Sequence, residues 1–219
     1  MSNPAEFTSK LVIDRVRGVI VVKNVRLSYP ALFRPKTMVG PDGKPQTPKY
    51  GAVFISHLPP QERDELLSLI KEIFLAKCPG KTLPADKMFA RKGDDTGKPE
   101  YAGAIILSAS ESVDRPPRVY NRDGKITASE ADVYSGCMVD AVIRPWPQDN
   151  AWGKRVNASL VAVKFVGDNV PFGLPPIDDA ELLGVEAGQA PVVTPNAAPS
   201  QDPGPGGPYS DPGEVDPWG

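Results

Sequence analysis

The alternation of apolar and polar residues over the first 170 positions predicts a mainly β domain. The segment 18–29 (GVIVVKNVRLSY) is rich in β-branched residues, and its second half alternates as a strand with one buried face does. Further strands are expected at 50–56, 101–109, 118–120, 134–146 and 155–166. Loops are expected at the proline-rich stretch 30–48, the charged stretch 91–100 and the stretch 147–154.

One helix is expected to follow the second strand. Pro59 and Pro60 suit a first helical turn, apolar residues then recur at helical spacing, and Pro79-Gly80 ends the pattern near Lys77. We interpret the apolar face of this helix as packing against a sheet. Five or more strands with a single helix after the second or third predict a small antiparallel barrel that the helix plugs.

The composition changes after Gly173, where Pro, Gly, Ala, Asp and Glu dominate. So little apolar surface does not offset the entropy of ordering, which predicts a disordered tail. We therefore divide the chain into a domain at 1–177 and an acidic Pro/Gly-rich tail at 178–219.

Basic and acidic residues are also distributed unequally between the two parts of the chain. Residues 1–164 hold all 25 Lys and Arg with 18 Asp and Glu, whereas residues 165–219 hold 9 acidic residues and no basic one. A basic body with an acidic tail is typical of a protein that binds a polyanion and releases it, and it indicates nucleic acid as the partner.

The sequence shows no set of residues of the kind that carries out catalysis. His57 is the only histidine, and GDDTGK at 93–98 has one residue too few between its glycines for a phosphate loop. We expect no enzyme activity, no metal and no cofactor. The two cysteines have no CxxC spacing, the N-terminus lacks an apolar signal core, and no apolar run could cross a bilayer, so we expect a cytoplasmic protein that does not associate with membranes.

Basic and aromatic residues lie next to one another along the body, as in proteins that pair phosphates with cations and stack unpaired bases on aromatic rings. The pairs at Trp146 and Trp152 are the strongest, because a hairpin end is a poor place to bury a tryptophan. The residues expected to bind DNA are Arg34, Lys49, Tyr50, Arg91, Lys92, Arg118, Tyr120, Arg122, Arg144, Trp146, Trp152, Lys154 and Arg155.

Four stretches carry a resemblance to a family of tailed-phage single-stranded-DNA-binding proteins. They are VRLSYPALF at 25–33, YAGAIILSAS at 101–110, RVYNRDGK at 118–125, and 134–173, which starts with YSG and ends with PFG. The resemblance implies an OB-fold that coats single-stranded DNA in phage replication, recombination and repair, in the host cytoplasm. It also implies an acidic tail that competes with DNA and recruits replication and recombination proteins. The candidate partner-binding residues of that tail are Asp211, Glu214, Asp216 and Trp218.

Two alternatives stay open at this point. One is an RNA-binding or strand-annealing protein on the same fold, and the other is a phage structural or assembly protein that does not bind DNA. The sequence also leaves open whether the chain forms a homodimer.

Overall fold

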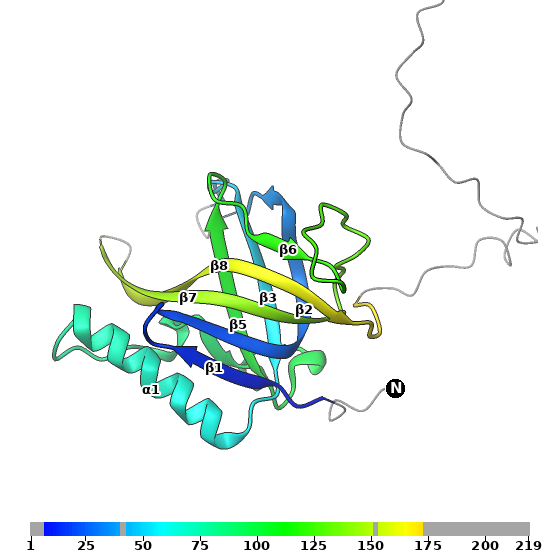
Figure 1. Cartoon of the computed structure of the whole chain (residues 1–219). Helices are drawn as coiled ribbons and strands as arrows, with labels where there is room; N and C mark the ends of the chain where they lie inside the picture. Colours follow the sequence, from blue (N-terminus) through cyan, green and yellow to red (C-terminus); the bar gives the residue numbers. More distant parts are fainter. Residues whose placement is uncertain (1–6, 40–42, 151–152, 173–219) are drawn as a thin grey trace, which may run out of the picture. The chain divides into compact units, whose positions relative to one another are not determined.

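The structure is a computed structural model that describes residues 7–39, 43–150 and 153–172 (Figure 1). Its strands are β1 (Lys10–Asp14), β2 (Val19–Lys36), β3 (Lys49–Ser56), β4 (Ala90–Lys92), β5 (Ile105–Ser112), β6 (Arg118–Tyr120), β7 (Met138–Asn150) and β8 (Gly153–Gly167). Helix α1 spans Pro60–Lys77, and short 3-10 turns follow at Ala85–Lys87, Asp94–Thr96 and Pro99–Tyr101.

Five of these strands form a ring. Going around it, β2 pairs with β3, β3 with β5, β5 with β8, β8 with β7, and β7 again with β2. Every pairing in the ring is antiparallel except the closing one, a single parallel pair between Ser110 and Ser159. This partly closed ring has the strand order of an OB-fold barrel. The predicted mainly β barrel with one helix is confirmed, with the difference that its closing contact is parallel.

The core lies inside the ring, and α1 covers one side of it. Alternate residues of the strands point inward, so that Val22, Phe54, Leu107, Ile143 and Leu160 are almost fully buried. The helix adds Leu66, Ile70 and Phe74 to the same cluster. Its Glu62 carboxylate accepts a hydrogen bond from the backbone N–H of Leu11, which satisfies part of the free edge of β1. The helix predicted at 60–77 is confirmed, as is its role in core packing.

Strand β2 is longer than its sequence indicates. The prediction of a loop from residue 30 is wrong for residues 30–36, since β2 continues to Lys36. Its pairing with β3 shifts register between Ser28 and Ala31 and again between Ala31 and Lys36. Pro30 and Pro35 fall within these irregular stretches, where a missing N–H costs the ladder little.

The hairpin of β7 and β8 extends further toward its tip than predicted, and β7 begins at Met138, so the strand predicted from residue 134 is wrong for residues 134–137. Residues 147–150 and 153–154 pair in a regular ladder that ends at Asn150 and Gly153, so the predicted loop at 147–154 is wrong outside residues 151–152, which the structure does not describe. Strands β1 and β4 were not predicted, and the loop predicted at 91–100 is wrong for residues 91–92, which belong to β4. Strand β5 starts at Ile105, four residues later than expected.

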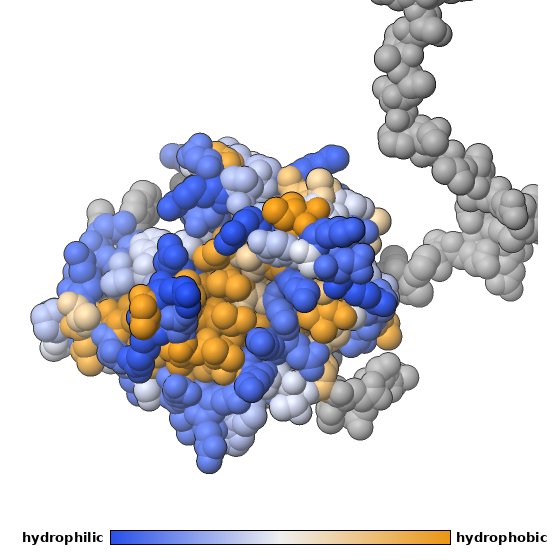
Figure 2. Space-filling model, viewed as in Figure 1, coloured by the Kyte–Doolittle hydropathy of each residue, from blue (hydrophilic) through white to orange (hydrophobic). Residues whose placement is uncertain are grey.

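The outer face of β1, β2 and β7 carries an apolar row. Register places Val12 beside Val21, Val21 beside Val142, and Val142 beside Ala162. Figure 2 shows apolar surface over this part of the sheet in the same view. Lys10 and Lys23 form the neighbouring exposed pair on this face. No helix among the described residues has the length and apolar character needed to cross a bilayer.

Candidate nucleic-acid interface

An open groove of about 980 Å³ lies on the outer face of β3, β4 and β5. Val53 of β3 and Ile106 and Ser108 of β5 line its floor. The cations that line it are Arg63, Arg91, Lys92 and Lys98, and the carboxylates are Asp64, Asp86 and Asp95. Arg91 and Lys92 are exposed on β4, while Asp86 is already paired with Lys87 at 3.0 Å. The β4 side of the groove is therefore the side suited to phosphates.

A row of small residues extends the groove floor across the seam of the barrel. Gly51 of β3 pairs with Ser110 of β5, Ser110 with Ser159 of β8, and Ser159 with Arg144 of β7. Residues paired in register share one face of a sheet, so these four lie side by side on the outside. Because Gly51, Ser110 and Ser159 are small, a polymer can approach the backbone of β3, β5 and β8 closely, and Arg144 of β7 lies at the end of the row.

The outward face of the β7–β8 hairpin continues this surface. Trp146 is 41 % exposed there, paired in register with Asn157, and Arg155 pairs with Gln148. Met88, which lines the groove, forms a bridge with Val156 of β8. This contact joins the groove to the hairpin, so that Arg91 and Lys92 flank one part of the surface while Arg144 and Trp146 flank the other.

Aromatic residues lie at the opposite side of the groove, near β2. Tyr29 is 60 % exposed, and the Lys98 ammonium donates a hydrogen bond to its hydroxyl at 2.6 Å. This hydrogen bond raises the pKa of Lys98, which stays charged at neutral pH. The hydroxyls of Tyr101 and Ser28 lie 3.0 Å apart, which fixes the buried Tyr101 ring beneath the groove.

The end of the described chain packs at the same site. Phe172 contacts a second apolar cluster of Ile55, Tyr101, Ala104 and Ile106, and two of its members, Tyr101 and Ile106, line the groove. The Arg26 guanidinium lies 3.9 Å from the Phe172 ring and donates hydrogen bonds to the carbonyls of Gly136 and Val170.

Five of the residues predicted to bind DNA lie on this joined surface, namely Arg91, Lys92, Arg144, Trp146 and Arg155. Lys49 extends it, because it pairs with Ser112 one step beyond the Gly51–Ser110 pair. Arg118 and Tyr120 lie on β6, which pairs with residues 162–164 of β8, three positions beyond the Ser159 that pairs with β5. Tyr50 is half-buried beside Glu111.

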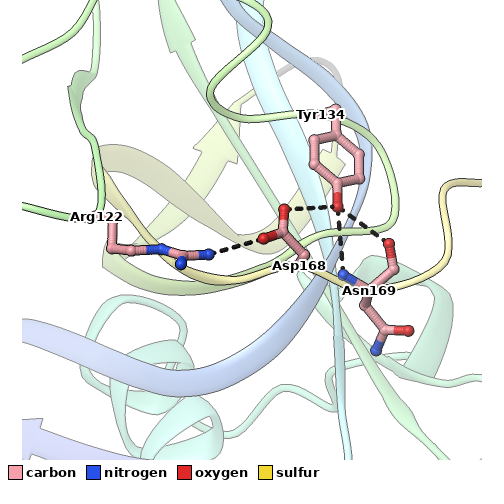
Figure 3. Close-up of polar contacts among 4 residues, drawn as sticks. All are labelled: Arg122, Tyr134, Asp168 and Asn169. Carbon is pink, nitrogen blue, oxygen red and sulfur yellow. Dashed lines mark hydrogen bonds and ion pairs between the residues drawn. The ribbon is translucent and has the colours of Figure 1, made fainter.

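Three predicted cations are engaged elsewhere. Arg34 is paired with Glu130 at 3.3 Å, and Lys154 with Asp149 at 2.5 Å, a contact that raises the pKa of Lys154. Arg122 pairs with Asp168 at 2.7 Å in the network of Figure 3, where the Tyr134 hydroxyl lies 3.1 Å from both a carboxylate oxygen of Asp168 and the carbonyl oxygen of Asn169 and shares its one hydrogen between them. This network ties the segment that follows β8 to the connection between β6 and β7. DNA contacts by Arg34, Arg122 and Lys154 stay predictions.

Trp152 and the tail residues Asp211, Glu214, Asp216 and Trp218 lie outside the described residues. Among the cations and aromatic residues that line the groove, Tyr29, Arg63, Lys98 and Tyr101 are not among the residues predicted to bind DNA. Tyr29 had one signal, its place beside a cation in the stretch VRLSYPALF. Lys98 had none, because its contact with Tyr29 spans 69 positions of sequence.

The described residues give no sign of a catalytic or metal centre. Among them, no three His, Cys, Asp or Glu side chains are placed to hold a metal ion. Burial raises the pKa of the Cys137 thiol to about 11, so this group is a poor nucleophile at neutral pH.

Comparison with known proteins agrees with this geometry. The family model described as "Enterobacter phage Enc34, ssDNA-binding protein" matches residues 18–181. Protein p50 of Acyrthosiphon pisum secondary endosymbiont phage 1 is 32 % identical over 165 residues, which cover 70 % of this chain and 85 % of that protein.

Solved structures of one phage protein are also similar. The single-stranded DNA-binding protein from bacteriophage Enc34 in complex with ssDNA is 34 % identical, with a TM-score of 0.62 over 78 % of this chain and 97 % of that chain. Another structure of the same phage protein is 31 % identical, with a TM-score of 0.61 over 82 % of this chain and 97 % of the other. The chain belongs to the family of the Enc34 single-stranded-DNA-binding protein.

Proposed function

We propose that this protein binds single-stranded DNA without sequence specificity and coats it during phage replication, recombination and repair. The observation that carries the proposal is the continuous outer surface from Arg91 on β4, across the Gly51–Ser110–Ser159 row, to Arg144 and Trp146 on β7. In this proposal, DNA binding depends on how the cations are arranged around the row of small residues, and not on where the cations occur in the sequence.

The chemistry of the surface explains a preference for unpaired strands. Cations at its borders bind phosphates, which every sequence presents, while exposed aromatic rings stack on bases whose faces are free. A duplex offers phosphates but no free base faces, so it gains only the first of these contributions. Neither a phosphate contact nor a stack on a base face depends on the identity of the base, so binding is expected to tolerate any sequence.

A titration with oligo-dT, followed by tryptophan fluorescence across a salt series, tests the proposal. Each phosphate neutralised on a single strand adds about −0.7 to the slope of log K against log salt, so four to six cations give a slope of about −3 to −4. A slope near zero, or equal affinity for a blunt duplex, would contradict the proposal. Tighter binding to rU than to dT of equal length would favour the RNA-binding alternative, and no binding at low salt would favour an assembly protein.

We further propose that the acidic segment 178–219 regulates the same surface and recruits replication and recombination proteins. Its eight acidic side chains carry the charge opposite to that of Arg91, Lys92 and Arg144. The segment is tethered to the body, and a tethered group acts at an effective concentration of about millimolar. Even weak charge pairing would then compete with incoming DNA.

Deleting residues 178–219 is therefore expected to raise affinity for oligo-dT, most of all below 50 mM salt, where screening is weakest. Fluorescence anisotropy of labelled oligo-dT measures the effect. The matched control keeps the length of the tail and changes its Asp and Glu residues to Asn and Gln, which should reproduce the gain in affinity. If the deletion and the control both bind as the full chain does at every salt concentration, the tail does not compete with DNA.

A further inference from the structure

Tyr29 adopts a backbone conformation that its residue type disfavours. Its φ is 47°, in the left-handed region, at the irregular stretch of β2 between Ser28 and Ala31. Asn24 is the other non-glycine residue with positive φ among those described, and asparagine tolerates that region. Hydrogen bonds also offset the backbone strain at Asn24. Its backbone N–H donates to the Asp140 carboxylate at 2.9 Å, and its side-chain amide donates to the Thr8 carbonyl.

The Tyr29 side chain gains little from the fold in return. It is 60 % exposed, so packing does not offset the strained backbone. Its hydrogen-bonded partner is the Lys98 ammonium, which also lies 4.3 Å from the centre of the Tyr29 ring and 5.2 Å from that of Tyr101. A glycine or asparagine would fit the backbone better, so the ring is retained at a cost to folding.

The ring is at the place where it can meet a ligand. Tyr29 lines the groove, next to Val53 on the floor and on the β2 side, while Arg91 lines it on the β4 side. Backbone strain of this kind gathers at ligand-binding positions, where the surrounding structure holds a side chain in a functional orientation.

We infer that Tyr29 is a stacking platform for one unpaired base, and that Lys98 binds the phosphate next to that base. The inference rests on the proposed function and assigns one subsite within it. Any base has a face that can stack on tyrosine, so the subsite adds affinity without sequence preference. Lys98 holds the ring edge through the hydroxyl and keeps two further N–H donors for a phosphate oxygen.

Two substitutions separate a binding role from a structural one. Tyr29→Asn removes the ring and suits the positive φ, so its melting temperature is expected to equal or exceed that of the wild type. Its affinity for oligo-dT is expected to fall about 5-fold to 150-fold, the range measured for loss of one base stack. Tyr29→Phe keeps the ring and removes the hydroxyl, and is expected to bind within about 3-fold of the wild type.

Photocrosslinking gives an independent readout. Oligo-dT carrying a single 5-iodouracil, irradiated in complex with the full-length wild-type protein, is expected to crosslink to the peptide that contains Tyr29. If Tyr29→Asn fails to fold, a crosslink at Tyr29 in the wild type still supports the subsite, and crosslinks only elsewhere overturn it. If Tyr29→Asn binds oligo-dT as tightly as the wild type does, the subsite is also overturned, while the proposed function stays intact. Failure of the wild type to bind oligo-dT overturns the proposed function itself.

Discussion

Reversing the charge of Arg91 and Lys92 together is expected to weaken binding of oligo-dT by about 100-fold or more. Both side chains are exposed on β4, line the groove, and form no ion pair with a described residue. A hydrogen bond to a charged group contributes about 1.5–3 kcal/mol, so two lost phosphate contacts amount to about 3–6 kcal/mol. Each 1.4 kcal/mol or so is a factor of ten in affinity.

The measurement is anisotropy of labelled oligo-dT at fixed salt, with Arg91→Glu/Lys92→Glu compared against a matched variant. Lys10→Glu/Lys23→Glu makes the same change in net charge on the outer face of β1 and β2, which lies outside the groove. This control is expected to lose only a few-fold in affinity, through long-range repulsion that salt screens. Equal losses in both variants would show that total charge, and not the groove, governs binding.

The fold could be predicted from sequence where a local pattern decides it. Strand β3 and helix α1 lie within one residue of their predicted bounds, because alternation and helical spacing act over short distances. The extension of β2 could not be predicted, since proline normally ends a strand and only the register shifts against β3 admit Pro30 and Pro35. Strands β1 and β4 have five and three residues, and each is held by the pairing of a neighbour.

The candidate site could be predicted from the sequence as a set of cations and aromatic residues, but its geometry could be predicted only in part. Cations beside aromatics are visible in the sequence, but the surface that joins Arg91 to Arg144 depends on the parallel pair Ser110–Ser159, which brings β5 against β8. Gly51, Ser110 and Ser159 carry no charge or ring that would mark them. Their place in the candidate site follows from register, which no short sequence pattern encodes across several strands.

Gly136 holds the last described segment against the barrel, and its backbone leaves no room for a side chain. Its φ is 107°, its N–H donates to the Leu27 carbonyl at 2.7 Å, and its own carbonyl accepts from Arg26. A Cβ at this position would lie 2.5 Å from the Val170 carbonyl oxygen and 2.7 Å from the Phe172 nitrogen. Both neighbours are backbone atoms, so they cannot move aside by changing a rotamer.

Gly136→Ala is therefore expected to lower the free energy of unfolding by about 3 kcal/mol or more. Strain at this φ accounts for about 1–3 kcal/mol of the loss. Displacement of residues 170–172 adds to it, because Phe172 would leave both its apolar cluster and the Arg26 guanidinium. For a domain of this size, the loss corresponds to a fall of about 6–12 °C in melting temperature, measured by circular dichroism.

The matched control is Gly124→Ala, at a turn glycine whose φ is 76° and whose Cβ would meet no atom within 4 Å. That variant introduces backbone strain without a steric clash, so its free energy of unfolding is expected to fall by about 1 kcal/mol. The difference between the two variants isolates the contact between residues 136 and 170–172. If both variants melt at the same temperature, the segment that ends at Phe172 contributes nothing to the stability of the barrel, and its packing beneath the groove does not support the binding surface.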